Sequence, residues 1–78
     1  MDIDYDRIDD AVLALMQLGR WDEHRAWKGF DWDALDRLHA KGLISDPKSK
    51  AKSIILTEEG QARSEALFRQ MFTKGSGR

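Results

Sequence analysis

The sequence predicts an α+β fold that is mainly α: three helices, a two-stranded β-hairpin and a C-terminal helix, in that order. Three observations predict it. Apolar residues recur at three- and four-residue spacing in the first 18 positions, a glycine at position 42 precedes a β-branched stretch at 53–56, and Thr57 precedes two acids and a long amphipathic segment. Helical spacing, then β-branched residues, then helical spacing again indicate a small helical domain that carries a hairpin.

Length and composition limit the class of protein. The 78 residues suffice for one domain, which we expect at 1–73, followed by a flexible tail at 74–78. The chain has no cysteine, which excludes disulfides and thiolate metal sites. We find no signal peptide and no apolar run of membrane length, so the expected location is cytoplasmic, with no membrane partner.

Charge is unevenly distributed along the chain, although the net charge is only −1. Residues 1–36 contain ten acids and four bases, whereas residues 37–78 contain four acids and nine bases. Such asymmetry is typical of a polar binding surface, and equally of two halves that attract each other within the fold or across a dimer.

The first helix is expected to follow Asp4 as its N-cap and to stop near Gly19. Its core-facing stripe comprises Tyr5, Ile8, Val12, Leu15 and Met16.

A short second helix is expected from Asp22, as its cap, to Gly29, with Ala26 and Trp27 facing the core. Four aromatic residues fall close together in this part of the chain: Trp21, Trp27, Phe30 and Trp32. Because bulky aromatics fill the cores of small domains, we expect most of the four to be buried.

Asp31 is the expected N-cap of the third helix, in which Leu35 and Leu38 face inward. Gly42 supplies the left-handed residue that ends this helix, and Leu43 packs back on it.

Residues 43–45 and 53–56 predict the two short strands of a hairpin, with Asp46-Pro47 as a turn and lysines at the tip. A two-stranded hairpin is not stable alone, so we expect it to lie on the helices.

Thr57 is the expected N-cap of the last helix, and Glu58 and Glu59 complement the dipole of its first turn. Its apolar arc is wide for a single small core and comprises Ala62, Ala66, Leu67, Phe68, Met71 and Phe72. Surplus apolar surface on a terminal helix predicts a homodimer, with an interface made by Leu67, Phe68, Met71 and Phe72.

Three joined segments resemble the winged-helix regulators of the multiple-antibiotic-resistance and phenolic-acid-repressor types: Leu35 to Ile44, Lys48 to Lys52, and Leu56 to Gly60. They resemble the end of the recognition helix, the charged wing tip and the cap of the C-terminal helix. The resemblance implies a winged helix-turn-helix-like fold. With Arg-Ala-Trp-Lys-Gly-Phe-Asp-Trp-Asp at 25–33, the chain also resembles a family of small bacterial proteins catalogued as a domain of unknown function, which implies no activity.

The winged-helix resemblance implies a DNA-binding transcriptional regulator, because winged helices place one helix in the major groove and the wing on the backbone. Lys48, Lys50 and Lys52 alternate along the wing and would contact phosphates. Arg37 and Lys41 are four residues apart on the third helix, so they are expected to share its exposed side.

The third helix also argues against DNA. Residues 31–42 contain three acids, Asp31, Asp33 and Asp36, but only two bases, and no Asn, Gln, Ser or Thr to read base edges. The alternative is a protein-interaction module, a dimeric adaptor or inhibitor that keeps the fold without binding DNA.

No enzymatic activity, cofactor or metal is expected. The two histidines, His24 and His39, have too few neighbouring ligands for zinc, which takes three or four. Asp9 and Asp10 are adjacent on a helix, so their carboxylates point to different sides and do not form a catalytic pair.

Overall fold

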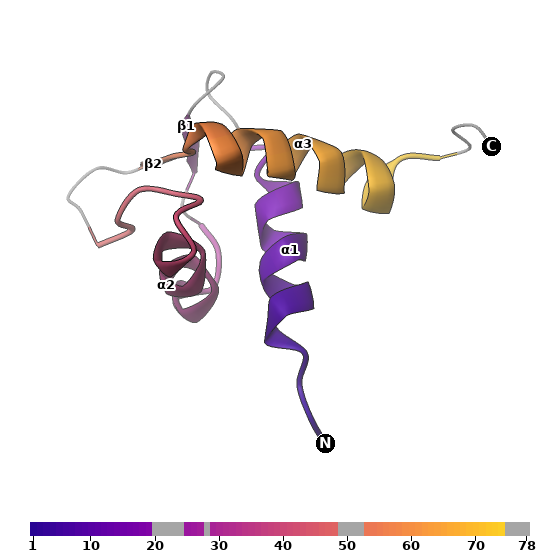
Figure 1. Ribbon diagram of the computed structural model, residues 1–78, viewed down its shortest axis with the longest axis horizontal. Coiled ribbons are helices and arrows are strands. Elements are labelled where there is room, and N and C mark those ends of the chain that lie inside the picture. Colours follow the sequence, from indigo (N-terminus) through magenta and orange to yellow (C-terminus); the bar gives the residue numbers. More distant parts are fainter. Residues whose placement is uncertain (20–24, 28, 49–52, 75–78) are drawn as a thin grey trace.

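Over the residues that the structure describes, the chain folds into three helices and a two-stranded antiparallel sheet. The computed structural model describes residues 1–19, 25–27, 29–48 and 53–74. The elements are α1 (Tyr5–Leu15), β1 (Arg25–Trp27), α2 (Trp32–Ala40), β2 (Ser53–Ile55) and α3 (Glu58–Phe72) (Figure 1). The fold is therefore α+β and mainly helical, as predicted, with three helices in the described residues where four were expected.

Each helix follows the cap residue that the sequence predicts. The side-chain oxygens accept hydrogen bonds from backbone N–H groups of the first turn: Asp4 from Arg7 at 3.1 Å, Asp31 from Ala34 at 3.1 Å, and Thr57 from Gly60 at 3.0 Å. These N–H groups have no partner inside their helices, so each cap stabilises a helix start.

The end of α2 is also as predicted. Gly42 has a φ of 78°, in the left-handed region that favours glycine. The backbone N–H of Leu43 then donates to the Leu38 carbonyl at 3.1 Å, which turns the buried Leu43 back toward the helix.

The prediction of a short helix at 22–29 is wrong for the part that the structure describes. Arg25–Trp27 form β1, which pairs antiparallel with β2 and sets Ala26 opposite Ile54. Ala26 is fully buried, as expected, but it reaches the core from a strand. A three-residue segment has little helical preference of its own, and the edge of β2 supplies backbone partners that a short helix would lack.

β2 has a second neighbour on its other edge. Ile44 forms an isolated antiparallel bridge with Leu56, and the Ser45 N–H donates to the Ile55 carbonyl at 2.8 Å. Ile55 therefore lies between Ser45, which its backbone contacts on one edge, and Arg25, its partner in β1 on the other edge. The hairpin predicted between 43–45 and 53–56 is thus reduced to a single bridge. Beside it lies the longer pairing of β1 with β2, which the sequence analysis did not predict.

The core lies between α1, α2 and the sheet. Its buried apolar residues are Val12, Leu13, Met16, Ala26, Ala34, Leu35, Leu38, Leu43, Ile44, Ile54 and Leu56. Phe30 and Leu67 pack against its edge. Among the residues that the structure describes, no helix is long and apolar enough to cross a membrane.

α3 crosses the C-terminal end of α1 (Figure 1), and its buried residues are the small Gly60 and Ser64. A Cβ atom on Gly60 would lie 1.9 Å from the Leu43 carbonyl oxygen, so only glycine permits this approach. The buried Ser64 hydroxyl donates to the Leu13 carbonyl at 2.6 Å and accepts from the Gln17 amide at 2.7 Å.

Candidate functional site

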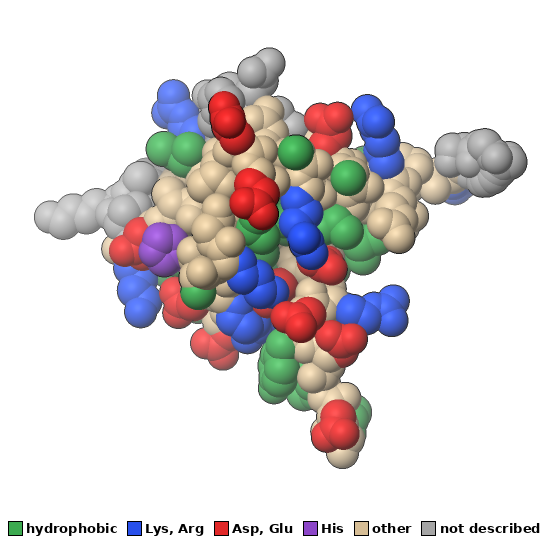
Figure 2. All heavy atoms as spheres, viewed as in Figure 1, with side chains coloured by type: hydrophobic (Ala, Val, Ile, Leu, Met, Phe, Trp, Pro, Cys, Tyr) green, Lys and Arg blue, Asp and Glu red, His purple; other side chains and the backbone are tan. Residues whose placement is uncertain are grey.

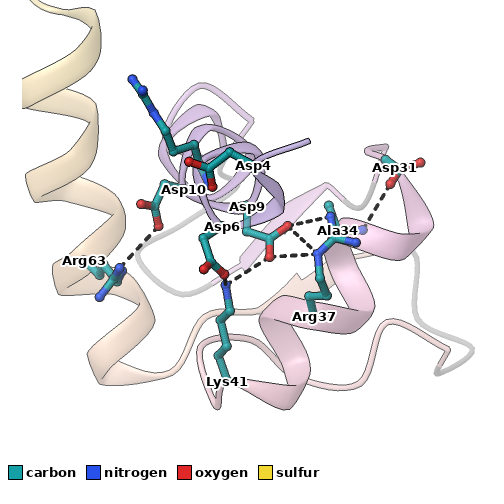
Figure 3. Close-up of polar contacts among 10 residues, drawn as sticks. Asp4, Asp6, Asp9, Asp10, Asp31, Ala34, Arg37, Lys41 and Arg63 are labelled. Carbon is teal, nitrogen blue, oxygen red and sulfur yellow. Dashed lines mark hydrogen bonds and ion pairs between the residues drawn. The ribbon is translucent and has the colours of Figure 1, made fainter. Parts of the chain in front are cut away.

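The two basic residues predicted on the exposed side of α2 point toward α1. The Arg37 Nε donates to both carboxylate oxygens of Asp9 at 2.9 Å, and the Lys41 ammonium lies 3.0 Å from Asp9 and 3.1 Å from Asp6 (Figure 3). Arg37 and Lys41 do share one side of the helix, as their spacing predicts. We call Asp6, Asp9, Arg37 and Lys41 the Asp9 cluster.

The Asp9 cluster places a buried carboxylate between two half-exposed cations. The Asp9 side chain is 0% exposed, whereas those of Arg37 and Lys41 are 31% and 38% exposed. Burial alone would raise the pKa of Asp9, but the hydrogen bonds and charges of Arg37 and Lys41 outweigh it and lower this pKa below its ordinary value. The hydrogen bond to Asp9 likewise raises the pKa of Arg37. Asp9, Arg37 and Lys41 are therefore ionised at neutral pH.

Neighbouring groups complete this ion-paired side. The Tyr5 ring lies under the Arg37 guanidinium, whose central carbon is 4.8 Å from the ring centroid. Asp10 points away from Asp9, as adjacent helix positions require, and pairs with Arg63 of α3 at 3.3 Å (Figure 3).

A polar hollow lies between the start of α3 and the Asp9 cluster. Its lining residues are Asp6, Asp10, Lys41, Leu43, Glu59 and Arg63. The face seen in Figure 2 mixes acidic and basic side chains over this region. Among the described residues only Glu59 of the charged lining lacks an ion-pair partner, so positive and negative groups largely neutralise each other here.

The exposed side of α2 is acidic. Asp31, Trp32 and Asp33 are exposed, and Asp36 is half-exposed. Trp32, one of the four aromatics of which most were expected to be buried, is 52% exposed. Phe30 is half-buried against the core, while Trp21 and the side chain of Trp27 lie outside the described residues.

Of the predicted wing lysines, the structure describes Lys48 alone. Its side chain is exposed and its ammonium lies 4.0 Å from the Asp36 carboxylate, while its backbone N–H donates to Asp46 at 2.9 Å. Lys50 and Lys52 fall outside the described residues, so the structure does not test whether the three share one face.

The four residues predicted for the dimer interface are partly accessible. Leu67 packs against the core edge, and Phe68 is half-buried with its ring 5.8 Å from that of Phe72. Met71 and Phe72 are 40% and 44% exposed. Ala62 and Ala66, assigned to the same apolar arc, are exposed as well.

Exposed apolar residues on α1 are a feature that sequence reasoning missed. Tyr5 and Ile8 were expected in the core, but they are 51% and 40% exposed, and Leu18 is 73% exposed. Val12 and Met16 of the predicted stripe are buried, and Asp9 and Leu13 complete the core-facing side of α1. The four-residue spacing of Arg37 and Lys41 places both on one side of α2, but it does not show that this side meets Asp9.

Within the described part of the chain, no group of three or more acidic or histidine side chains is arranged to hold a metal ion. His39 is near the end of α2, where its Nδ1 lies 3.1 Å from the Ile44 carbonyl oxygen.

Comparison with known proteins gives one family and one close relative. The family described as "Domain of unknown function (DUF6429)" matches residues 4–74. The "Uncharacterized protein y4hR" of Sinorhizobium fredii (strain NBRC 101917 / NGR234) is 61% identical over 74 residues, which cover 95% of this chain and 100% of that protein. No solved structure matches.

Proposed function

This chain belongs to the family described as domain of unknown function DUF6429, and we propose that it is a non-enzymatic protein-binding module with a winged-helix-like fold. The order of helix, strand, helix, strand and helix supports the winged-helix assignment. So does the Ile44–Leu56 bridge, which closes a lysine-containing connection in the position of a wing.

The observation that carries the proposal is which charged side chains of α2 are paired within the fold and which are exposed. Arg37 and Lys41 neutralise the buried Asp9, and the exposed start of α2 presents Asp33, the Trp32 ring and the cap residue Asp31. Carboxylates facing DNA phosphates repel them by about 1 kcal/mol per close pair in water, and by more once desolvated.

The same surface suits a protein partner. Tryptophan is enriched among the residues that dominate binding energy in protein interfaces, and flanking charges steer a partner of opposite sign. The partner that fits is a basic segment or surface with an apolar pocket for Trp32. We call Asp31, Trp32, Asp33 and Asp36 the α2 acidic surface.

The test is binding of the purified chain to an array of short peptides that vary in Lys/Arg and apolar content. We expect basic peptides with apolar residues to bind, and Trp32→Ala to weaken that binding at least about tenfold, the usual scale for an interface anchor. Glu65→Gln, which changes an exposed acid of α3, is the matched control and should leave binding unchanged. Equal binding of wild type and Trp32→Ala would contradict the proposal.

DNA binding is the second candidate, favoured by the exposed Lys48 and by the alternation of lysines at 48, 50 and 52. In that case Arg37 and Lys41 would add contacts only by leaving Asp9. Wild type should then be retained on DNA at about 50 mM salt, and glutamate at the three lysines should abolish retention. Such a result would replace the protein-binding proposal with this one.

We propose further that the chain acts in the cytoplasm as a homodimer that uses Leu67, Phe68, Met71 and Phe72. The partial exposure of Phe68, Met71 and Phe72 supports this, because apolar side chains at the free end of a helix gain stability when a second surface covers them.

A further inference from the structure

A small pocket lies between α1 and α3 and shares only Asp10 with the polar hollow. Its lining comes from Arg7 and Asp10 of α1 and from Leu67, Gln70 and Met71 of α3. Its volume is about 140 Å³. Because a cavity of about 150 Å³ holds a benzene ring, the pocket has room for a molecule of roughly that size. We call it the α1–α3 pocket.

Helical spacing explains why these residues meet. Arg7 and Asp10 are three residues apart on α1, and Gln70 and Met71 follow Leu67 by three and four residues on α3. Residues at these spacings are neighbours on one side of a helix, with Cβ atoms about 5–6 Å apart. Each helix therefore presents one side to the pocket, α1 with two charged groups and α3 with two apolar side chains and an amide.

Arg7 supplies a cation to the pocket. It is exposed and has no ion-pair partner among the residues that the structure describes. The acid on the same side of α1, Asp10, pairs instead with Arg63 of α3 at 3.3 Å, as Figure 3 shows. A guanidinium offers a planar fork of N–H donors that fits a carboxylate, so a carboxylate is the group that Arg7 can hold here.

Asp10 supplies the opposite charge. Its side chain is 29% exposed, and its contact with Arg63 uses the oxygen Oδ1. The second oxygen, Oδ2, has no hydrogen-bond partner among the described residues. An ionised carboxylate only accepts hydrogen bonds, so a protonated amine is the charged group that complements it.

Leu67 and Met71 provide the apolar surface of the pocket. Leu67 is half-buried against the edge of the core, and Met71 is 40% exposed. The unbranched Met71 side chain adapts to irregular shapes. Gln70 adds an exposed side-chain amide, which both donates and accepts. An apolar surface with a few polar groups around it is typical of sites for small molecules.

We infer that the α1–α3 pocket binds a free α-amino acid with a small aliphatic side chain. The carboxylate accepts from Arg7, the ammonium group donates to Asp10, and the side chain packs on Leu67 and Met71. A simple carboxylate would bring its charge beside Asp10, and a simple amine would bring its charge beside Arg7. Only a molecule that carries both charges is attracted at both ends. This binding site goes beyond the protein-binding module proposed above and does not depend on it.

Titration of the isotope-labelled chain with L-valine, followed by amide chemical shifts, tests the site. We expect saturable shifts at the pocket residues with a dissociation constant of about 1 mM, the weak affinity of a small ligand with few contacts. Arg7→Gln should raise this constant at least about tenfold, because it removes the charged partner of the carboxylate. The matched control is Arg69→Gln, which removes an exposed arginine of α3 outside the pocket and should leave binding unchanged.

Two analogues of valine test each charge without altering the protein. Valinamide keeps the ammonium group and lacks the carboxylate, whereas isovalerate keeps the carboxylate and lacks the ammonium group. We expect each to bind at least about tenfold more weakly than valine. The analogues replace a variant of Asp10, because Asp10→Asn would also release Arg63 from its ion pair.

Leu67 and Met71 also belong to the proposed dimer interface, so Phe72→Glu protein, which keeps every pocket residue and is expected to be monomeric, is titrated beside wild type. Saturable binding in either protein that weakens with Arg7→Gln and with the loss of either charge supports the site. The inference is wrong if valine causes no shift in either protein up to about 20 mM, far above the expected dissociation constant. Equal binding of valine and isovalerate, or equal binding by wild type and Arg7→Gln, would overturn it as well.

Discussion

The side of α1 that faces α2 contains an acid, whereas the side that faces solvent contains apolar residues that were expected in the core. The inward side holds the Asp9 carboxylate, which is 0% exposed, and the outward side holds Ile8 and Leu18, which are 40% and 73% exposed. A buried acid is tolerated where two cations surround it. Apolar residues left in solvent, in contrast, suit a contact outside the chain.

α3 shows the same contrast in its packing. Its buried residues are Gly60 and Ser64, and its large apolar residues Phe68, Met71 and Phe72 remain partly or largely accessible. Because its small residues let α3 approach the Leu43 carbonyl and α1 closely, the large apolar side chains of α3 lie outside this contact. The comparison teaches that, on both helices, the inward side holds the fold together and the outward side is free for binding.

The largest effect is expected from removing both cations of the Asp9 cluster. Arg37→Ala with Lys41→Ala leaves the Asp9 carboxylate buried without compensation, which costs about 3–5 kcal/mol for an isolated buried charge. Urea unfolding measures the loss. The matched control is Arg69→Ala, which breaks only the exposed pair with Glu65 and should change stability by less than about 0.5 kcal/mol. Equal losses of unfolding free energy in both variants would mean that the cations around the buried Asp9 stabilise the fold no more than an exposed ion pair does.

A smaller effect is expected from Gly60→Ala. The added methyl group would overlap the Leu43 carbonyl oxygen, so α3 must shift, at a cost of about 1–3 kcal/mol typical of overpacking. Gly29→Ala is the matched control, because a Cβ atom there meets nothing within 4 Å. Thermal unfolding of both variants decides the matter; an unchanged melting temperature for Gly60→Ala would show that α3 is not held by this close contact.

The smallest effect is expected from Asp9→Asn, and it depends on pH. The folded pKa of Asp9 is lowered by Arg37 and Lys41, so its contribution is complete above the ordinary aspartate pKa of about 3.9 and disappears as the pH falls through the folded pKa. Asparagine still accepts a hydrogen bond from Arg37, so we expect a loss of about 1 kcal/mol at neutral pH. Below about pH 4 this difference from wild type should shrink.

The control for this pH dependence is Asp2→Asn, whose carboxylate has no ion-pair partner among the described residues. Free energies of unfolding at several pH values provide the measurement. A constant difference between wild type and Asp9→Asn down to the lowest pH would mean that Asp9 is not stabilised as an ion.

Local features of the fold were predictable from the sequence. The caps Asp4, Asp31 and Thr57 and the stop at Gly42 each depend on hydrogen bonds that span at most five residues. The strand at 53–55 was predictable from its β-branched residues, although its main partner was not.

The candidate site was less predictable, because its contacts join distant positions. Arg37 and Lys41 reach Asp9 across 28 and 32 residues. Their spacing correctly places both on one side of α2, but no periodicity shows that this side meets α1 rather than solvent. The same limit explains why Ile8 was assigned to the core.

The sequence by itself determined where the three helices begin, where α2 ends and that the chain is α+β, since each of these follows from neighbouring residues. Only the tertiary structure decided that Arg25–Trp27 pair with β2 and that Asp9 is buried. It also decided that acids stay exposed at the start of α2 and that apolar residues stay exposed on α1 and α3. The physical reason is that a helix has several possible inward sides, and the elements that pack against it determine which one becomes the core.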